Sequence, residues 1–384
     1  MTATGFLELF VSVSVQAALV VIITHWLGRM TNNERLHCRL WSLCYLVLLL
    51  LVAIGLLLPH PRLFQPWTGV GGDNAATLFY LGMRVGRALL VVWLAGATVS
   101  LLLFVVSWVQ TFRFLKTCQP IDPAVLSIDK LAAHECSEAE RRSTGKTLLL
   151  TSTGLATPFC WQLHRPYIVL PEYLLGFGEQ ELRFIIRHEL AHLGNGHPLQ
   201  LFLQRVVEIL FWFHPMVWWA SQQSAFAREF ACDDAAVDSP TEIGAYLRSL
   251  LTIVERGAAD PEKVRGPLAF GGGKSIVSKR ARRLVQIAHK RPAPDRRPVP
   301  DSVLSASLIF AAALTAFVWL PVNVLASPRA SWSPWPAWTS AVLHDFGVSA
   351  RDFDIYYGGL EPHELLEHIH SVGAEAVAPE SKRD

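Results

Sequence analysis

The stretch His188-Glu189-Leu190-Ala191-His192 places two imidazoles four residues apart, with a carboxylate beside the first. On an α-helix, residues i and i+4 lie on the same face, so both imidazoles can bind one zinc ion. Glu189 then lies within reach of a water molecule on that ion. The stretch predicts a hydrolytic zinc site, and the alternative is a pair of ordinary solvated or core histidines.

The residues on both sides of this stretch favour a helix. Glu179 and Glu181 precede it, and the apolar run Leu182, Phe184, Ile185, Ile186 supplies a face that can be buried. Gly194 offers a C-terminal stop. We therefore expect the two histidines to lie near the end of an amphipathic helix.

A catalytic zinc ion usually has three protein ligands and one open position, so a third ligand is required. Residues 218–237 predict a second helix with an acidic cluster. Glu229 is the best candidate, because Asp233 lies four residues later on the same face and could accept the outer N–H of a ligating histidine. Asp234 is a weaker candidate. A solvated helix face would also explain the cluster, and Cys232 is more typical of a small buried residue than of a zinc ligand.

The composition predicts a membrane protein. Of 384 residues, 51% are hydrophobic and 17% charged, and the mean hydropathy is +0.31, which is too apolar for an ordinary soluble enzyme. Four segments are long enough to span a bilayer: 6–27, 41–58, 88–108 and 303–326. The first has no basic leader and is followed at once by another span, so we expect a retained anchor rather than a cleaved signal peptide.

Basic residues predict the orientation of these spans. They follow the first and third spans and precede the fourth, at Arg29, Arg35, Arg39, Arg113, Lys116, Lys279, Arg280, Arg282, Arg283, Lys290, Arg291, Arg296 and Arg297. Because cytoplasmic loops are rich in Lys and Arg, we expect both termini outside. The predicted domains are three membrane helices (1–110), a cytoplasmic domain (111–300), a fourth membrane helix (301–326) and a short extracytoplasmic tail (327–384). The basic cluster favours anionic lipid over direct contact with nucleic acid.

Three further segments bear on the site. Residues 199–220 are apolar, but Arg205, Glu208 and His214 interrupt them, so a helix buried in the domain or lying on the membrane surface is expected rather than a fifth span. Residues 147–151 and 167–170 predict short strands. One of them could be an edge strand that pairs with an extended substrate, or both could be core strands.

Taken together, these motifs resemble those of the BlaR/MecR-type integral-membrane zinc metallopeptidases, the antirepressor proteases of β-lactam sensing. The resemblance covers roughly residues 5–326 and depends on the order of several pieces, namely Trp93 to Gly96, Thr157-Pro158, Arg165 to Pro171, His188 to His192, Phe213 to Trp219 and Arg228 to Asp233. No single piece decides the match. The match depends on the order and spacing that all the pieces share with the family.

The resemblance implies a mainly α membrane protein with four spans and a cytoplasmic α+β, gluzincin-like metalloprotease domain in a bacterial inner membrane. It implies that His188, His192 and Glu229 bind Zn²⁺ and that Glu189 is the general base, with Asp233 behind the ligands. The implied substrate is a cytoplasmic protein such as a winged-helix repressor. His197 and His214 could assist in stabilising the oxyanion, although each is more typical of a hydrogen-bonded structural histidine.

The sequence departs from the β-lactam sensors of this family in one respect. Those sensors have an acyl-accepting domain of about 250 residues after the last span, whereas here residues 327–384 follow it. The S-x-x-K matches at 127–130 and 143–146 precede the zinc motif and lack companion motifs, so no covalent β-lactam binding is expected. The pattern at 363–368 fails the zinc spacing, because Glu367 stands where a second histidine is needed, and an amphipathic helix is the better interpretation.

Three functions fit these features. The first is a regulatory membrane protease with one defined cytoplasmic substrate. The second is a membrane quality-control protease of the HtpX type, which would cleave many misfolded proteins. The third is a non-catalytic signalling scaffold, because zinc binding does not prove turnover. The sequence does not define the oligomeric state or the inducing signal.

Overall fold

The computed structural model describes residues 3–58, 60–61, 73–122, 147–162, 165–259, 273–289 and 300–322. The tail (327–384), both S-x-x-K matches and the 363–368 pattern lie outside these residues. The chain divides into two compact units, one formed by residues 1–20, 47–95 and 309–384 and the other by residues 21–46 and 96–308. The predicted metal site lies in the second unit.

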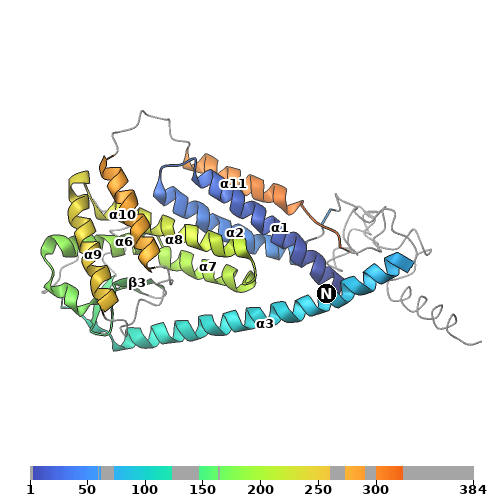
Figure 1. Cartoon of the computed structure of the whole chain (residues 1–384), viewed down its shortest axis with the longest axis horizontal. Coiled ribbons are helices and arrows are strands. Elements are labelled where there is room, and N and C mark those ends of the chain that lie inside the picture. Colours follow the sequence, from blue (N-terminus) through green and yellow to red (C-terminus); the bar gives the residue numbers. More distant parts are fainter. Residues whose placement is uncertain are drawn as a thin grey trace, which may run out of the picture. The chain divides into compact units, whose positions relative to one another are not determined.

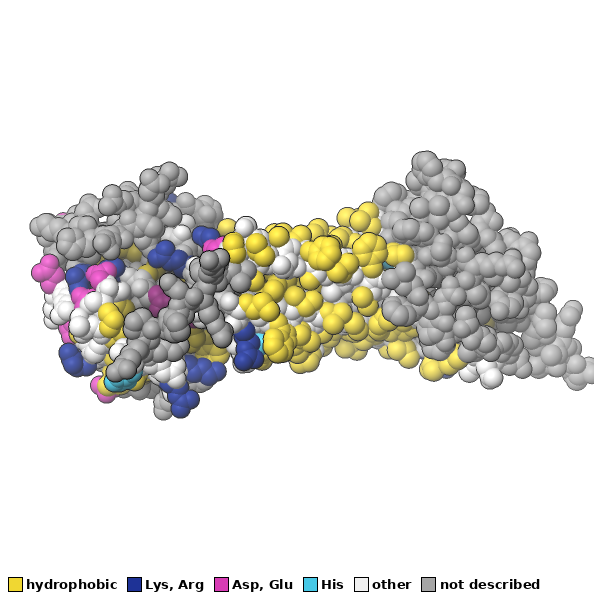
Figure 2. All heavy atoms as spheres, turned by 90° about the horizontal axis from the view of Figure 1, so that it is seen from above, with side chains coloured by type: hydrophobic (Ala, Val, Ile, Leu, Met, Phe, Trp, Pro, Cys, Tyr) yellow, Lys and Arg dark blue, Asp and Glu magenta, His cyan; other side chains and the backbone are white. Residues whose placement is uncertain are grey.

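Three helices are long and apolar enough to cross a membrane: α1 (Ala3–Gly28), α2 (Glu34–Leu57) and the Thr77–Thr117 part of α3 (Asp73–Thr117) (Figure 1). They contain the first and third predicted spans and all but the last residue of the second. Figure 2 shows hydrophobic side chains gathered over one face of the helical part of the molecule, and many large apolar side chains of α1, α2 and α3 are exposed. Such a surface suits contact with lipid rather than with water.

The fourth predicted span differs from its helix. Helix α11 (Asp301–Ala316) has 16 residues and is therefore about 24 Å long, shorter than the hydrocarbon core of a bilayer. Residues 317–322 are not helical, and Pro321 disfavours helical backbone at the residue before it. The count of four spans stays a prediction.

Within the first unit, polar side chains of α1 fasten the chain that leaves α11. Glu8 accepts hydrogen bonds from Trp319 Nε1 and the Val322 N–H, Ser12 Oγ accepts one from the Leu320 N–H, and Gln16 Nε2 donates to the Val318 carbonyl. Non-helical backbone is tolerated at membrane depth only where protein groups satisfy it. The buried polar side chains of α1 therefore satisfy backbone groups that the irregular segment after α11 leaves without helical hydrogen bonds.

The second unit contains a four-stranded sheet in the order β1-β2-β4-β3: β1 (Gln119–Pro120), β2 (Leu148–Ser152), β3 (Phe159–Gln162) and β4 (Pro166–Pro171). Strands β2 and β4 are parallel, and the other two pairs are antiparallel. Apolar residues of β4 and of α6 (Glu179–Gly194) form the core between sheet and helix, including Ile168, Leu170, Ile186 and Leu190. This packing fixes the helix that bears the H-E-x-x-H motif.

Four more helices surround α6 in the second unit: α7 (His197–Leu210), α8 (Pro215–Ala236), α9 (Ile243–Ala259) and α10 (Gly273–His289) (Figure 1). The apolar stretch 199–220 is divided between α7 and α8, as expected for a segment that does not span. Pro215 causes the break, because it disfavours a helical conformation at His214 and starts a new helix.

Candidate metal centre and active site

Helix α6 carries three predicted site residues near its C-terminal end, His188, Glu189 and the partly buried His192. The chain before the helix is fastened by the Glu181 carboxylate, which accepts a hydrogen bond from the Gly178 N–H at 3.2 Å. His188 and Glu189 are only 7% and 6% exposed. The helix ends at Gly194, but Gly196 rather than Gly194 takes the left-handed conformation, with φ of 67°. Glycine adopts this conformation without strain, and it turns the chain sharply into α7.

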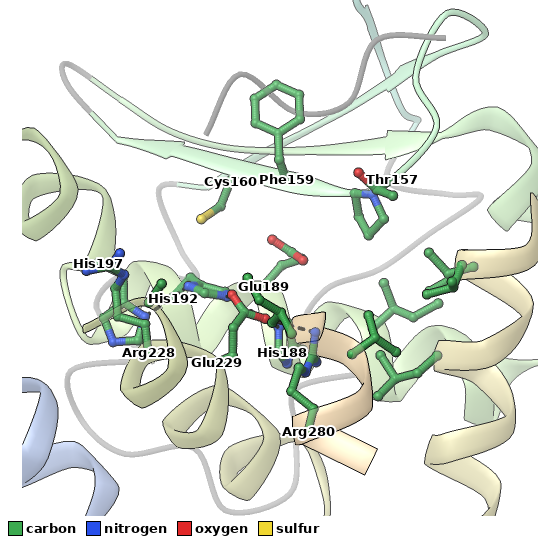
Figure 3. Close-up of a pocket in the computed structure, with 18 of the residues that line it drawn as sticks. Thr157, Phe159, Cys160, His188, Glu189, His192, His197, Arg228, Glu229 and Arg280 are labelled. Carbon is green, nitrogen blue, oxygen red and sulfur yellow. Dashed lines mark hydrogen bonds and ion pairs between the residues drawn. The ribbon is translucent and has the colours of Figure 1, made fainter. Parts of the chain in front are cut away.

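Glu229 on α8 reaches both histidines of α6 (Figure 3). Its Oε2 lies 3.6 Å from His188 Nε2, its Oε1 lies 3.6 Å from His192 Nε2, and the two Nε2 atoms are 3.3 Å apart. Ligands about 2.05 Å from a tetrahedral zinc ion lie about 3.4 Å from one another. The three donor groups predicted from the sequence therefore lie close enough together to fit a zinc ion, and their binding of zinc stays a prediction.

The outer nitrogen of His188 meets Asp233 and Tyr246. Asp233 is fully buried, with Oδ1 3.4 Å from His188 Nδ1. The Tyr246 hydroxyl donates to this oxygen at 2.6 Å and lies 3.0 Å from His188 Nδ1, whose proton it can accept. This arrangement keeps the proton of His188 on Nδ1 and leaves the Nε2 lone pair for a metal. Tyr246, on α9, was not predicted from the sequence.

Arg280 on α10 is the second site residue that sequence reasoning missed. Its Nη1 lies 2.8 Å from Glu229 Oε2, and its Nε and Nη2 donate to both oxygens of Asp233. We predicted this arginine to be part of a basic cluster near the membrane surface, but it is 8% exposed and lies between two acidic site residues. The i+4 spacing of Glu229 and Asp233 puts both carboxylates on one helix face, which was the one sequence feature that called for such a partner.

The other acidic candidate points elsewhere. Asp234 pairs with Arg283 through two hydrogen bonds of 2.6 and 2.8 Å, and its side chain is 42% exposed. One residue along an α-helix is a rotation of about 100°. Asp233 therefore faces the histidines while Asp234 faces away, and only Glu229 among these acids lies near both Nε2 atoms.

Burial and charged neighbours together set the protonation of the site. Burial raises the pKa of Glu189 to about 7. It lowers the pKa of His192 to about 3, so this imidazole is neutral, the form in which a nitrogen lone pair is free for a metal. Burial also disfavours the charged form of Glu229, but the Arg280 guanidinium outweighs it and holds the pKa of that carboxyl well below its usual range. Glu229 is therefore a carboxylate.

A cavity of about 300 Å³ opens over these residues. Glu189 projects into the space between His192 and strand β3, and Thr157, Phe159 and Cys160 lie across from it (Figure 3). The remaining wall is mainly apolar and comes from α6, α9 and α10, with Ile185, Leu250, Ile253, Val254, Ile276 and Val277. An apolar cavity with a few convergent polar groups is typical of a binding site.

The strand beside the cavity is not one that we predicted. Residues 147–151 and 167–170 do form strands, β2 and β4, but these pair with each other inside the sheet. The edge next to the site is β3, which has only four residues and pairs with β4 alone among the described strands. Its short length and the proline just before it concealed it from periodicity arguments.

Comparison with protein families agrees with this architecture. The model of the family described as BlaR1 peptidase M56 matches residues 74–277, more than half of the chain. The matched range contains all but the first residue of α3, together with the sheet, α6 to α9 and all the predicted site residues.

A curated relative is also similar. The "Regulatory protein BlaR1" of Bacillus licheniformis is 29% identical to this chain over 154 residues, which is 40% of this chain. The matched stretch spans a quarter of the relative's own length.

We predict that Glu229→Ala removes zinc while the fold persists. The remaining donors, two histidines, hold zinc at least about 100-fold more weakly, a larger loss than an outer hydrogen-bond partner causes. Zinc content after dialysis against a weak chelator measures this loss, and Asp234→Ala is the matched control. Full zinc retention by Glu229→Ala would assign the third ligand to another residue.

We predict that Arg280→Met destabilises the metal-free protein. Asp233 is then buried without its cationic partner, which costs roughly 3–5 kcal/mol. Arg282, two residues away and exposed, provides the control, because Arg282→Met leaves all these contacts intact. Thermal unfolding of both variants in detergent and excess chelator tests this. Equal melting temperatures would show that Arg280 is dispensable to the cluster.

Proposed function

Because this chain belongs to the BlaR1 peptidase M56 family, we propose that it is a membrane-embedded zinc endopeptidase that hydrolyses a peptide bond of a cytoplasmic protein. One observation supports this above all. His188, His192 and Glu229 converge at spacings that suit zinc, and Glu189 stands beside them at the floor of a cavity (Figure 3). The metal donors, the base and the space for a substrate coincide at this cavity, whereas the second cavity, of about 240 Å³, is lined by no histidine.

Each residue of the site has a role in this proposal. His188, His192 and Glu229 bind the zinc, which when bound acidifies water and polarises a carbonyl group. Glu189 takes the proton from the attacking water and passes it to the leaving amine. Asp233 and Tyr246 orient the His188 ring, and Arg280 keeps Glu229 and Asp233 ionised and in place.

The proposed substrate is an extended peptide segment that lies along β3. Strand β3 has a free edge among the described strands, and an extended chain can add to such an edge through main-chain hydrogen bonds. Phe159 and Cys160 of this strand line the cavity, so the added segment would cross above Glu189. The apolar wall formed by Ile253, Val254 and Val277 favours an apolar side chain next to the cleaved bond.

A regulatory role is the best match to the family. The similar Bacillus licheniformis protein is called a regulatory protein, and a repressor would be a suitable cytoplasmic substrate for a relative of it. A quality-control protease would use the same catalytic residues on many substrates. The number of proteins cleaved therefore distinguishes a regulatory protease from a quality-control protease. Any peptide hydrolysis at all distinguishes both from a non-catalytic scaffold.

The proposed location is a bacterial inner membrane, with residues 111–300 in the cytoplasm and both termini outside. The three long apolar helices support the membrane placement. The distribution of Lys and Arg supports the orientation, although Arg280 and Arg283 are engaged by acidic partners within the second unit.

We predict that Glu189→Gln abolishes peptide hydrolysis and leaves zinc bound. Loss of the general base slows hydrolysis by about 100-fold or more. Quantitative proteomics of membranes and cytosol, with wild type and Glu189→Gln expressed at equal levels, detects the products. One or two cleavage products that require Glu189 would indicate a regulatory protease, and many would indicate quality control. Identical peptide profiles under every stress tested would favour a dormant enzyme that awaits its signal, or the scaffold.

We also predict the orientation of the chain in the membrane. A reporter that is active only in the cytoplasm should be active when fused after residue 200, and a reporter that is active only outside should be active when fused after residue 350. The reason is that cytoplasmic loops retain Lys and Arg. The opposite pattern of reporter activity would reverse the orientation and place the candidate active site outside.

A further inference from the structure

A second group of metal-binding side chains adjoins the first. His192, His197 and Cys232 bring three donor atoms within 4.8 Å of one another, on the side of the His192 ring that faces away from Glu229. From this geometry we infer that the group is an inhibitory site for a soft monovalent cation, Cu⁺, which competes with zinc for His192. This inference rests on the proposed function and adds a regulator to it.

The fold brings the three residues together by a sharp turn and a helix face. Gly196 in the left-handed conformation turns the chain, so that His197 begins α7 directly beside the end of α6. The Nδ1 atoms of His192 and His197 are 2.9 Å apart. Cys232 lies three residues after Glu229 on α8, and its Sγ is 3.4 Å from His197 Nδ1. His197 and Cys232 are 2% and 0% exposed, so solvent does not explain their orientation.

The donor set and the local charge favour Cu⁺. Thiolate and imidazole are ligands that soft ions prefer, and one sulfur with two nitrogens offers three positions. Arg228 lies next to His192 and His197 and is itself buried, with one nitrogen bonded to Ser224 Oγ (Figure 3). A divalent ion beside this guanidinium adds uncompensated charge. Cu⁺ with the Cys232 thiolate adds none, which lowers the cost of burial.

One neutral imidazole ring, such as that of His192, cannot bind metal at both sites. A neutral imidazole has one nitrogen lone pair, because the other nitrogen bears the proton. When His192 Nε2 holds zinc, its Nδ1–H donates to His197 Nδ1. When Nδ1 binds Cu⁺, the proton moves to Nε2, the Cys232 thiol releases its proton to solvent, and no electron is transferred. Zinc is then left with His188 and Glu229.

Anaerobic titration of the zinc-loaded full chain in detergent with Cu⁺, supplied as its acetonitrile complex, tests the inference. X-ray absorption at the copper edge should show one sulfur and two nitrogen ligands at one equivalent. Zinc affinity should fall at least about 100-fold, since one of three ligands is lost, and hydrolysis should fall with it. The first two measurements do not depend on turnover, so an inactive protein would reject the proposed protease without deciding the copper site.

Two cysteine variants complete the test. The Cys232→Ser variant should have a zinc affinity and a rate of peptide hydrolysis within about twofold of wild type, because Cys232 does not face the zinc donors. The same variant should lose the copper–sulfur signal and the inhibition by Cu⁺. Cys118→Ser, which removes a more accessible free thiol, should behave as wild type. The inference is overturned by a copper–sulfur signal that survives Cys232→Ser. It is equally overturned if copper binds Cys232 while zinc and hydrolysis are retained.

Discussion

The buried carboxylate of Asp233 is the constraint on which the site depends. A charge with no solvent contact must be paired, and Asp233 is paired by Arg280 from α10 and by the Tyr246 hydroxyl from α9. The same hydroxyl contacts His188 of α6. One acidic group on α8 therefore joins four helices, and the positions of His188 and Glu229 follow from that junction.

The two rings of the H-E-x-x-H motif have different surroundings. His188 is backed by acidic and phenolic oxygens, as is common for a metal-binding histidine. His192 is backed by a second imidazole, which has its own lone pair and a thiol beside it. The Asp233 carboxylate is already paired by Arg280 and Tyr246, whereas the His197 imidazole has a nitrogen lone pair that can itself bind a metal. Because of this difference, His192 is the ligand for which Cu⁺ can compete with zinc.

In the apolar helices, too, buried polar groups are paired, but here side chains of one helix pair with the backbone of another segment. Glu8, Ser12 and Gln16 recur every four residues on α1 and satisfy the irregular backbone after α11. Without water, an unpaired backbone group is costly, so an unwound segment and a polar helix face require each other. Both units thus contain buried polar groups that satisfy one another across separate elements.

The sequence by itself determined the local features. It determined the helix that bears His188 and His192, the acidic pair at i and i+4 on a second helix, and three long apolar helices, because each depends on periodicity within one element. It did not determine β3, Tyr246, Arg280 or the contact of His197 with His192. These depend on which residues, up to 58 positions apart, the packing of α6 to α10 brings together. Only the tertiary structure decides such contacts, because a buried charge is costly unless a charge of opposite sign, which can be distant in the sequence, lies next to it.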